Sequence, residues 1–268
     1  MIEVKGVEIA AVACRAGGPL FENALAVSRI AAEGRNIRGV VAATFSNTMR
    51  FPSLAVSLAG ALGLPKSVPA FDIQMACSAY PYAIYAASKL AEDAGGEILV
   101  IDGDCHSGLV DDGDKATGGI FADAASASVV RSSGDFRSRF DFMTLHSDAL
   151  ACPSHGPIRM DGFKVFSFVA TEVSAFLKEF GNSFDMFVPH QANAYMVRQL
   201  AKSLSLEEKL LAFDEGMKNP GSCSVPMALA MKGRPGSALL AGFGAGFSAG
   251  AATVRVASGA LLSFSPTL

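Results

Sequence analysis

The chain has 268 residues, of which 50% are hydrophobic and 18% are charged, and its formal net charge is −3. This composition predicts a large buried core, in one large domain or two of ordinary size, and argues against disorder. There is no run of Lys or Arg, which argues against nucleic acid as the main partner, and no apolar stretch long enough for a convincing membrane span.

The cysteines and the first residues bear on the cellular setting. Five cysteines are widely spaced, with no C-x-x-C pair among them: Cys14, Cys77, Cys105, Cys152 and Cys223. An odd number without paired spacing argues against a disulfide framework and against a structural zinc site. The chain opens on a strand-like segment rather than on the charged and apolar regions of a signal peptide. We therefore expect a cytoplasmic protein that holds no metal.

Strand-like apolar runs alternate with helical patterns in the first half of the chain. The expected strands cover residues 4–12, 39–44, 68–75, 97–102 and 125–131. The expected helices cover residues 21–33, 54–64 and 78–94. Alternation of this kind predicts a parallel sheet with helices on both faces.

A second series of elements begins with an expected strand at residues 138–146. It continues with helices at residues 161–180, 192–203 and 222–231, and with strands at residues 186–189, 210–213, 238–243 and 249–256. Two segments rich in Gly, Asp or Pro, residues 107–124 and 148–158, are expected to form loops.

The two series run in the same order, strand-helix-strand-helix-strand-helix-strand-strand, and no linker separates them. We interpret this order as an internal duplication with a boundary near residues 132–137. The predicted fold class is therefore α/β with two βαβαβαββ halves. The N-terminal half covers residues 1–135, and the C-terminal half covers residues 136–268.

Cys77 lies where the expected strand at residues 68–75 ends and the helix at residues 78–94 begins. Unpaired backbone N–H groups and the helix dipole favour an anion at such a corner. We therefore expect the pKa of the Cys77 thiol to be lowered. This placement is typical of a nucleophile.

Two polar residues in the second half are suitable partners for that nucleophile. His190 follows an apolar run in V-P-H-Q-A-N, and Asn219 precedes the expected helix at residues 222–231. Cys77 opens the third helix of one half and Asn219 lies just before the third helix of the other. A pseudo-twofold axis between the halves would make these two residues face each other, and Cys, His and Asn at strand ends form a catalytic pattern.

Six short motifs resemble, in order along the chain, those of the β-ketoacyl-ACP synthase III family. They are F-P-S at residues 51–53, A-C-S-A at 76–79, F-A-D-A-A-S-A at 121–127, V-P-H-Q-A-N at 188–193, N-P-G-S-C-S-V-P at 219–226 and G-F-G-A-G-F at 242–247. The resemblance implies a thiolase-like fold, in which the duplicated halves form a five-layer αβαβα sandwich.

The resemblance also implies a decarboxylative Claisen condensation in fatty-acid or polyketide synthesis, without a cofactor. Cys77 would accept an acyl group from acyl-CoA or acyl-ACP, and His190 and Asn219 would bind the thioester carbonyl of malonyl-ACP. Backbone N–H groups of Cys77 and Ala245 would form an oxyanion hole for the tetrahedral intermediate.

Further residues take expected roles from the same resemblance. Phe51 resembles the position that shapes the partner's acyl pocket across a homodimer, so we expect a homodimer. Phe121 and Phe247 are expected to line or gate the pocket, although a core role fits them equally well. Arg198 and Lys202 are the candidates for contact with acyl carrier protein or its phosphate.

Several positions depart from the family pattern. A stretch that usually carries a Trp and an Arg for the adenine of coenzyme A has no counterpart, and the chain has no Trp. Tyr195 stands in place of a basic residue, Ala245 in place of a glycine, and N-P-G-S in place of N-T-S-A. These departures favour a carrier protein over coenzyme A as the primer donor.

Two alternative functions remain open at this stage. One is a thiolase-fold acyltransferase that uses Cys77 without decarboxylation. The other is a non-catalytic partner subunit of a heterodimeric synthase. The remaining cysteines are expected to be small core residues, and three histidines are expected to be structural or on the surface: His106, His146 and His155.

Overall fold

Helices and strands alternate along the first half of the chain as predicted, with boundaries shifted by a few residues. The computed structural model describes residues 1–266, so the last two residues of the predicted half at 136–268 lie outside the described residues. The elements before the midpoint are β1 (Ile2–Ala16), α1 (Leu20–Ala32), β2 (Ile37–Ala43), α2 (Leu54–Ala61), β3 (Ala70–Ile73), α3 (Ala79–Ala94) and β4 (Glu97–Asp104).

The second series also follows the predicted order. Its elements are β5 (Ala124–Thr144), β6 (Leu150–Ala151), β7 (Arg159–Met160), α4 (Gly162–Phe168), α5 (Ser174–Lys178), β8 (Met186–Pro189), α6 (Ala194–Leu204), α7 (Ser224–Lys232), β9 (Gly236–Gly244) and β10 (Ser248–Ser265). The expected strand at residues 210–213 is reduced to a single bridge between Leu210 and Phe187. The hairpin of β6 and β7 and the continuation of β10 beyond residue 256 were not predicted.

β5 is one strand of 21 residues, where two separate strands were predicted. Its pairing with β1 moves from Gly6 and Ser133 to Lys5 and Arg137, so a bulge stands where a break was expected. Beyond the bulge, β5 also pairs with β10. The proposed boundary between residues 135 and 136 falls inside this strand, and the division into two domains stays a prediction.

Eight strands form one hydrogen-bonded sheet in the order β3-β2-β4-β5-β1-β10-β9-β8. The sheet is mixed, and the prediction of parallel sheets is wrong in this respect. β5 is antiparallel to β4 and β1, and β10 is antiparallel to β9, because no helix separates β4 from β5 or β9 from β10. The N-terminal half has the strand order third, second, fourth, fifth, first. The C-terminal half repeats this order when the Leu210 bridge counts as its third strand, β8, β9 and β10 as its second, fourth and fifth, and the end of β5 as its first.

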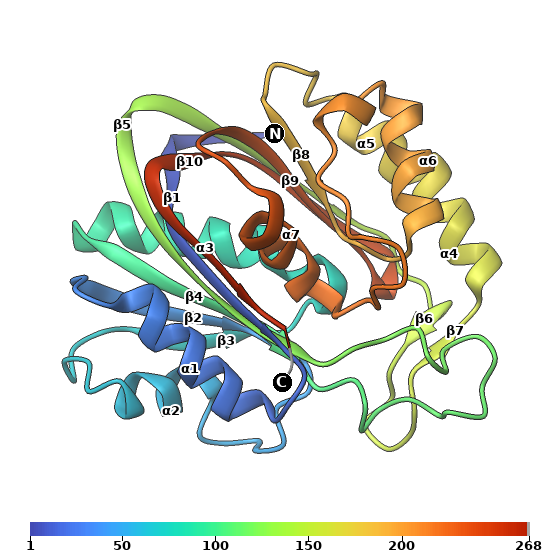
Figure 1. The fold of residues 1–268 in the computed structure, drawn as a ribbon, viewed down its shortest axis with the longest axis horizontal. Coiled ribbons are helices and arrows are strands. Elements are labelled where there is room, and N and C mark those ends of the chain that lie inside the picture. The colour runs from blue at the N-terminus through green and yellow to red at the C-terminus, as the bar shows by residue number, and fades with distance from the viewer. Residues whose placement is uncertain (267–268) are drawn as a thin grey trace.

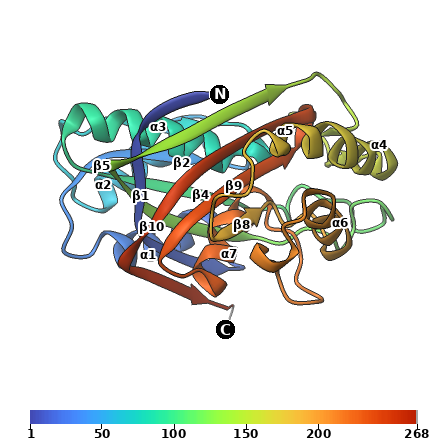
Figure 2. The same ribbon diagram turned by 90° about the horizontal axis from the view of Figure 1, so that it is seen from above.

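The sheet bends so that its two wings enclose a pair of helices (Figures 1 and 2). α1 and α2 cover the outer face of the N-terminal wing, and α4, α5 and α6 cover the outer face of the C-terminal wing. α3 and α7 lie between the wings, where α3 contacts β2, β4, β9 and β10 and α7 contacts β1, β8, β9 and β10. This is the five-layer arrangement that was predicted.

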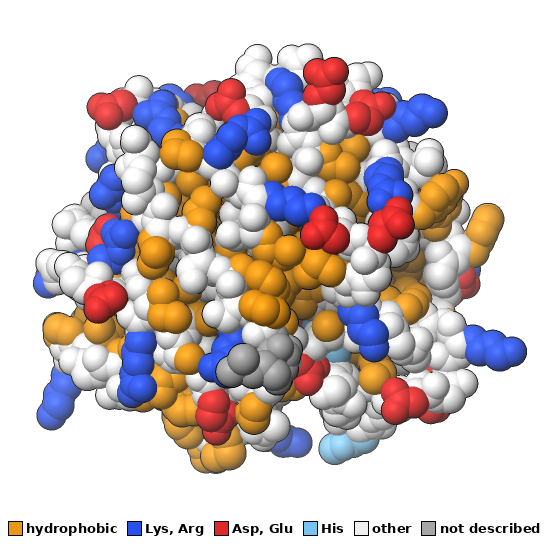
Figure 3. Space-filling view, in the orientation of Figure 1, with side chains coloured by type: hydrophobic (Ala, Val, Ile, Leu, Met, Phe, Trp, Pro, Cys, Tyr) orange, Lys and Arg blue, Asp and Glu red, His pale blue; other side chains and the backbone are white. Residues whose placement is uncertain are grey.

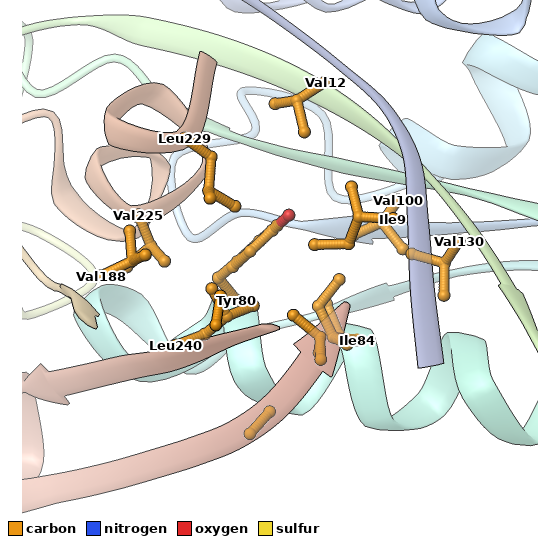
Figure 4. Packing of buried hydrophobic residues seen from close by; sticks show 14 of the residues in the cluster. Ile9, Val12, Tyr80, Ile84, Val100, Val130, Val188, Val225, Leu229 and Leu240 are labelled. Carbon is orange, nitrogen blue, oxygen red and sulfur yellow. The ribbon is translucent and has the colours of Figure 1, made fainter. Parts of the chain in front are cut away.

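Tyr80 lies in the central layer among aliphatic side chains from both halves, including Ile9 and Leu229 (Figure 4). Its ring is fully buried, and its hydroxyl lies 2.8 Å from Ser128 Oγ. The polar tip of a large aromatic residue thus has a partner inside the apolar core.

The start of α2 illustrates how local sequence determines a helix end. Ser53 Oγ accepts a hydrogen bond from the Val56 N–H at 3.3 Å, which satisfies one of the free N–H groups of the first turn. The Asp72 carboxylate accepts the N–H groups of Leu54 and Ala55, each at 2.8 Å. A negative charge at this end also complements the helix dipole.

The surface in Figure 3 carries acidic and basic side chains interspersed with one another. Within residues 1–266, none of the helices combines the length and the apolar character needed to cross a membrane. The cytoplasmic location stays a prediction.

Candidate active site

Cys77 lies in a single 3-10 turn at Ala76–Ser78, between β3 and α3. The residue before it, Ala76, has a positive φ of 43°, a conformation that side chains seldom adopt. Cys77 itself is buried, and only 5% of the residue is exposed. The predicted strand-to-helix corner is therefore present, in a strained form.

The Cys77 thiol differs from the expectation in its acidity. Burial, together with the nearby carboxyls of Asp104 and Asp102, raises the pKa of Cys77 to about 12. The backbone N–H groups of Ala245 and Cys77 act in the opposite direction. The expectation of a lowered pKa is wrong because desolvation outweighs the donors at the helix start. Those two N–H groups are the ones predicted to form the oxyanion hole.

His190 follows β8 and is 98% buried, since only 2% of it is exposed. Its backbone N–H donates to the Ala241 carbonyl at 2.7 Å, which ties the end of β8 to β9. Burial lowers the pKa of His190 to about 4, and the Gly221 carbonyl opposes this shift. The imidazole is therefore neutral at pH 7.

Ser224 favours one tautomer of the neutral His190 ring. Its hydroxyl accepts the Gln191 N–H at 3.0 Å and lies 2.8 Å from His190 Nδ1. Because the Gln191 N–H uses the hydroxyl as an acceptor, the hydroxyl hydrogen is free to point to Nδ1. Nδ1 then accepts, and the ring proton is on Nε2.

Asn219 is also buried, with 6% exposed, on the loop before α7. Its side-chain Oδ1 accepts the Gly221 N–H at 2.8 Å. Its backbone N–H donates to the Ile120 carbonyl, and its own carbonyl accepts from the Ala122 N–H. These bonds tie the loop that carries Asn219 to the segment that precedes β5. Because Oδ1 already accepts the bond from the Gly221 N–H, the NH₂ group of the Asn219 side chain is available to donate a hydrogen bond to a ligand.

A small cavity of about 130 Å³ brings Cys77, His190 and Asn219 together in one lining. Apolar side chains from β7, α4 and β9 complete it, among them Met160, Val165 and Phe243. A surface hollow of about 280 Å³ shares four lining residues with it: Ile120, Ala192, Asn193 and Asn219. The hollow therefore lies against the small cavity on the side of Asn219.

A second cavity of about 430 Å³ also reaches Cys77. It shares Cys77, Phe121 and Leu150 with the small cavity, so the two spaces meet at the thiol. Ala245 lines this larger cavity. A reactive group on Cys77 can therefore contact a molecule on either side.

The three predicted pocket phenylalanines lie in different environments. Phe121 lines both cavities and pairs with Asn219 through a backbone bridge. Phe247 stacks on Phe168 with ring centroids 4.3 Å apart and is absent from the linings of the cavities described above. Phe51 is 82% exposed on the segment before α2 and is likewise outside these linings.

The two predicted carrier contacts are exposed on α6. Arg198 pairs with Glu215 at 3.1 Å, whereas Lys202 has no ion-pair partner among residues 1–266. Lys218, which was not predicted, is exposed and lines the hollow that leads to Asn219. It precedes Asn219 directly in the sequence, and this adjacency could have singled it out.

The other polar residues of the H-Q-A-N motif have structural roles. The Gln191 amide donates to the carbonyls of Pro189 and Leu211 and accepts the Phe213 N–H at 2.9 Å. Asn193 caps α6 by accepting the Met196 N–H at 2.8 Å. His190, Ala192 and Asn193 of this motif line the small cavity.

His106 was expected to be structural or on the surface, yet it lines the larger cavity beside Cys77 and is 1% exposed. Asp104, two residues earlier, is also buried and belongs to the end of β4. The ends of parallel strands β2, β3 and β4 meet at the edge of the sheet that holds Cys77. That rule could have identified both residues from the sequence.

Within residues 1–266, no cluster of three or more His, Cys, Asp or Glu side chains is arranged to hold a metal ion. The polar groups around Cys77 are the imidazoles of His190 and His106, the Asn219 amide, two carboxyls and backbone N–H groups. Such a set can stabilise anionic oxygen atoms beside a nucleophile.

The fold and sequence were compared with known proteins. Residues 71–149 match the family model of 3-oxoacyl-[acyl-carrier-protein] synthase III, and residues 181–256 match the model of its C-terminal region. The mycobacterial β-ketoacyl-[acyl-carrier-protein] synthase III of Mycobacterium marinum is 32% identical over 86% of this chain and 78% of its own length.

Two solved structures share the fold over nearly the whole chain. The 3-oxoacyl-(acyl-carrier protein) synthase of Burkholderia xenovorans LB400 gives a TM-score of 0.88 at 22% identity, covering 99% of this chain and 98% of that one. The priming β-ketosynthase of the R1128 polyketide pathway gives a TM-score of 0.83 at 24% identity, covering 94% and 96%. The chain therefore belongs to the 3-oxoacyl-[acyl-carrier-protein] synthase III family, also called β-ketoacyl-ACP synthase III, and has its thiolase-like fold.

Proposed function

We propose that this member of the family is an acyltransferase that extends an acyl primer by two carbons from malonyl-ACP, with loss of carbon dioxide. The observation that carries the proposal is the single small cavity lined by Cys77, His190 and Asn219. These residues come from three separate parts of the chain, and their chemistry fits a thiol nucleophile with two neutral donors.

In the first half-reaction, Cys77 Sγ attacks the carbonyl carbon of the primer thioester. The tetrahedral oxyanion would be held by the N–H groups of Cys77 and Ala245. The bond to the donor sulfur breaks, and that sulfur leaves with the proton of the Cys77 thiol. The acyl chain would then extend into the larger cavity, which Ala245 lines.

In the second half-reaction, the thioester carbonyl of malonyl-ACP would accept hydrogen bonds from His190 Nε2 and from the Asn219 amide. Carbon dioxide leaves, and the electron pair of the broken bond becomes an enolate that these two donors stabilise. The enolate carbon attacks the acyl-Cys77 carbonyl. The tetrahedral intermediate expels the Cys77 thiolate, which takes a proton from water.

The carrier arm would enter through the hollow lined by Lys218 and Asn219. Its phosphate would contact Lys218, which lines the hollow, or Arg198 or Lys202 on α6, and all three residues are exposed. Carrier protein is preferred here over coenzyme A as the primer donor, because Tyr195 replaces a basic residue and no Trp is present.

We also propose a homodimer that covers the segment before α2. Three large apolar side chains in and beside this segment are exposed, at 58% for Met49, 82% for Phe51 and 49% for Val56. Neighbouring β3 is an edge strand of the sheet. Such a surface is typical of an interface.

The proposal is tested by intact-mass spectrometry and by trapping of released carbon dioxide. Acyl-ACP or acyl-CoA primers should add one acyl group to the protein, and the adduct should be absent from Cys77→Ala. Cys105→Ser, which changes a thiol outside both cavities, is the matched control and should load normally. Acylation without carbon dioxide release from malonyl-ACP would instead favour an acyltransferase that does not decarboxylate.

A further inference from the structure

His106 is a second histidine beside Cys77, and the chemistry proposed above does not use it. Its ring stacks on Phe121, with centroids 5.1 Å apart and planes 6° apart. Phe45 meets it edge-on at 5.5 Å. Two aromatic residues therefore hold the imidazole in a fixed orientation in the wall of the larger cavity.

The hydrogen bonds of His106 leave one nitrogen for a ligand. Nδ1 lies 2.9 Å from the Ala122 carbonyl oxygen, which can only accept, so Nδ1 carries a hydrogen. Nε2 has no partner among residues 1–266. The side-chain polar atoms there that are both sealed from solvent and unpaired are Ser28 Oγ and Asp102 Oδ1. Nε2 is therefore unpaired and not wholly sealed from solvent.

Gly221 makes room for this ring. A Cβ atom on Gly221 would lie 2.8 Å from His106 Cε1, closer than real Cβ contacts, and 3.0 Å from Nε2. The N–H of the same glycine donates to Asn219 Oδ1. The imidazole is thus packed against the loop that holds a proposed catalytic residue, close to where the acyl group would join Cys77.

The Asp104 carboxyl interacts electrostatically with the ring. Asp104 Oδ1 accepts hydrogen bonds from Thr44 Oγ1 at 2.9 Å and from Ser46 Oγ at 2.8 Å, among others. Burial raises the pKa of Asp104, and attraction to His106 opposes that shift. A neutral His106 offers an acceptor at Nε2, and a protonated one offers a donor. A hydroxyl group can both donate and accept, so it can pair with either form of the ring. A carboxylate can only accept and pairs with the protonated form, and an ammonium can only donate and pairs with the neutral form.

We propose that the primer acyl chain carries a hydroxyl group near its thioester end and that His106 Nε2 binds this hydroxyl. The inference rests on the proposed function, since it identifies the substrate class of that site. A plain chain that filled the larger cavity would exclude water from Nε2 without replacing its hydrogen bond. Losing this hydrogen bond should lower kcat/KM for the plain chain by about tenfold or more relative to the hydroxylated chain.

The test compares 2-hydroxyacyl, 3-hydroxyacyl and plain acyl primers of equal length, presented as ACP thioesters. The kcat/KM for Cys77 acylation is measured for each by intact mass. At least one hydroxylated primer should be preferred over the plain one by about tenfold.

Two substitutions at one position separate hydrogen bonding from packing. His106→Asn can keep the donor to the Ala122 carbonyl but lacks an atom at Nε2, so the preference should disappear. His106→Gln places a polar group near the Nε2 position and should retain part of it. His155→Asn changes an exposed histidine outside the cavity linings and should leave the preference intact.

Equal loading of plain and hydroxylated primers by the unaltered protein would overturn the inference while leaving the proposed function intact. A preference that survives in His106→Asn would overturn it as well. Failure of every primer, plain ones included, to acylate Cys77 would contradict the proposed function and this inference with it.

Discussion

The Cys77 thiol is protonated at neutral pH, because burial raises its pKa to about 12. Iodoacetamide should therefore alkylate Cys77 in the substrate-free protein more slowly than the exposed Cys152. The rate at Cys77 should rise about tenfold per pH unit between pH 7 and pH 10 as the thiolate fraction grows. Peptide mass mapping distinguishes the two sites. A rate that levels off near pH 7 would show a lowered pKa and contradict the burial argument.

Ser224 positions His190 without touching substrate. Ser224→Ala removes the partner of Nδ1, so the ring loses its preference for a proton on Nε2. We expect decarboxylation to slow by about tenfold while acylation of Cys77 is unchanged. Ser224→Thr keeps the hydroxyl and should restore the rate. Equal loss in both variants would indicate a packing defect instead.

Some residues of the candidate site could be predicted from the sequence, and others could not. Cys77, His190 and Asn219 stand in motifs at element ends, so their positions could be predicted. His106 and Ser224 gain their significance from partners distant in sequence, Ala122 and His190. Such contacts depend on how the chain packs, and no spacing pattern encodes them. The acidity of Cys77 was misjudged for the same reason, since burial is a property of the folded molecule.

The turn between β9 and β10 approaches Cys77 through a glycine. Gly244 has a φ of 144°, and a Cβ atom there would lie 3.1 Å from Cys77 Cβ. Gly244→Ala should cost about 1–3 kcal/mol of stability and slow acylation. Thermal melting and intact-mass loading measure the two effects.

Gly60, inside α2, is a matched control for that substitution. It has no atom within 4 Å of an added Cβ, so Gly60→Ala should raise stability by about 0.5–1 kcal/mol and leave loading unchanged. A normal melting temperature for Gly244→Ala would show that the turn adapts, and the proposed close approach would be wrong.

Helix and strand identities were largely predictable, and boundaries and interruptions were not. The expected helix at residues 161–180 begins at Gly162, and a π-helical turn at Val169–Val173 divides it into α4 and α5. Val169 lines the small cavity, so the irregular turn faces the site. The spacing of apolar residues predicts a helix, but it does not show that one turn contains an extra residue, as a π-helical turn does. Likewise, β5 continues through the expected break near residues 132–137, because the polar residues there form a bulge within the strand.

The interface between the two halves contains a buried acid. Asp102 is fully buried, and Ser222 Oγ donates to its Oδ2 at 2.7 Å while Oδ1 is unpaired. Burial raises its pKa well above the ordinary 3.8. The folded carboxyl therefore keeps its proton where the unfolded one loses it, and stability falls as pH rises above 3.8.

Asp102→Asn mimics the protonated carboxyl at every pH. It should melt at least about 2 °C higher than the unaltered protein at pH 8, and the difference should shrink as pH falls toward 4. Differential scanning calorimetry across this range is the measurement. A difference that does not depend on pH would mean that the carboxyl is charged in both states or in neither.

The duplication could be inferred from the order of elements, and the paired strand orders and central helices α3 and α7 agree with it. The joining of both wings into one sheet could not be inferred. It depends on β1 pairing with β10 and on β5 pairing with both, contacts between segments far apart in sequence.

The central claim is that Cys77 carries the acyl group while His190 and Asn219 drive decarboxylation in the same site. The most direct test measures acylation of Cys77 and decarboxylation of malonyl-ACP separately in the variants His190→Ala and Asn219→Ala. Each variant should still form acyl-Cys77 by intact mass but release carbon dioxide from malonyl-ACP about 100-fold to 1,000-fold more slowly. Carbon dioxide release at the unaltered rate in both variants would contradict the claim, as would a β-ketoacyl product from Cys77→Ala.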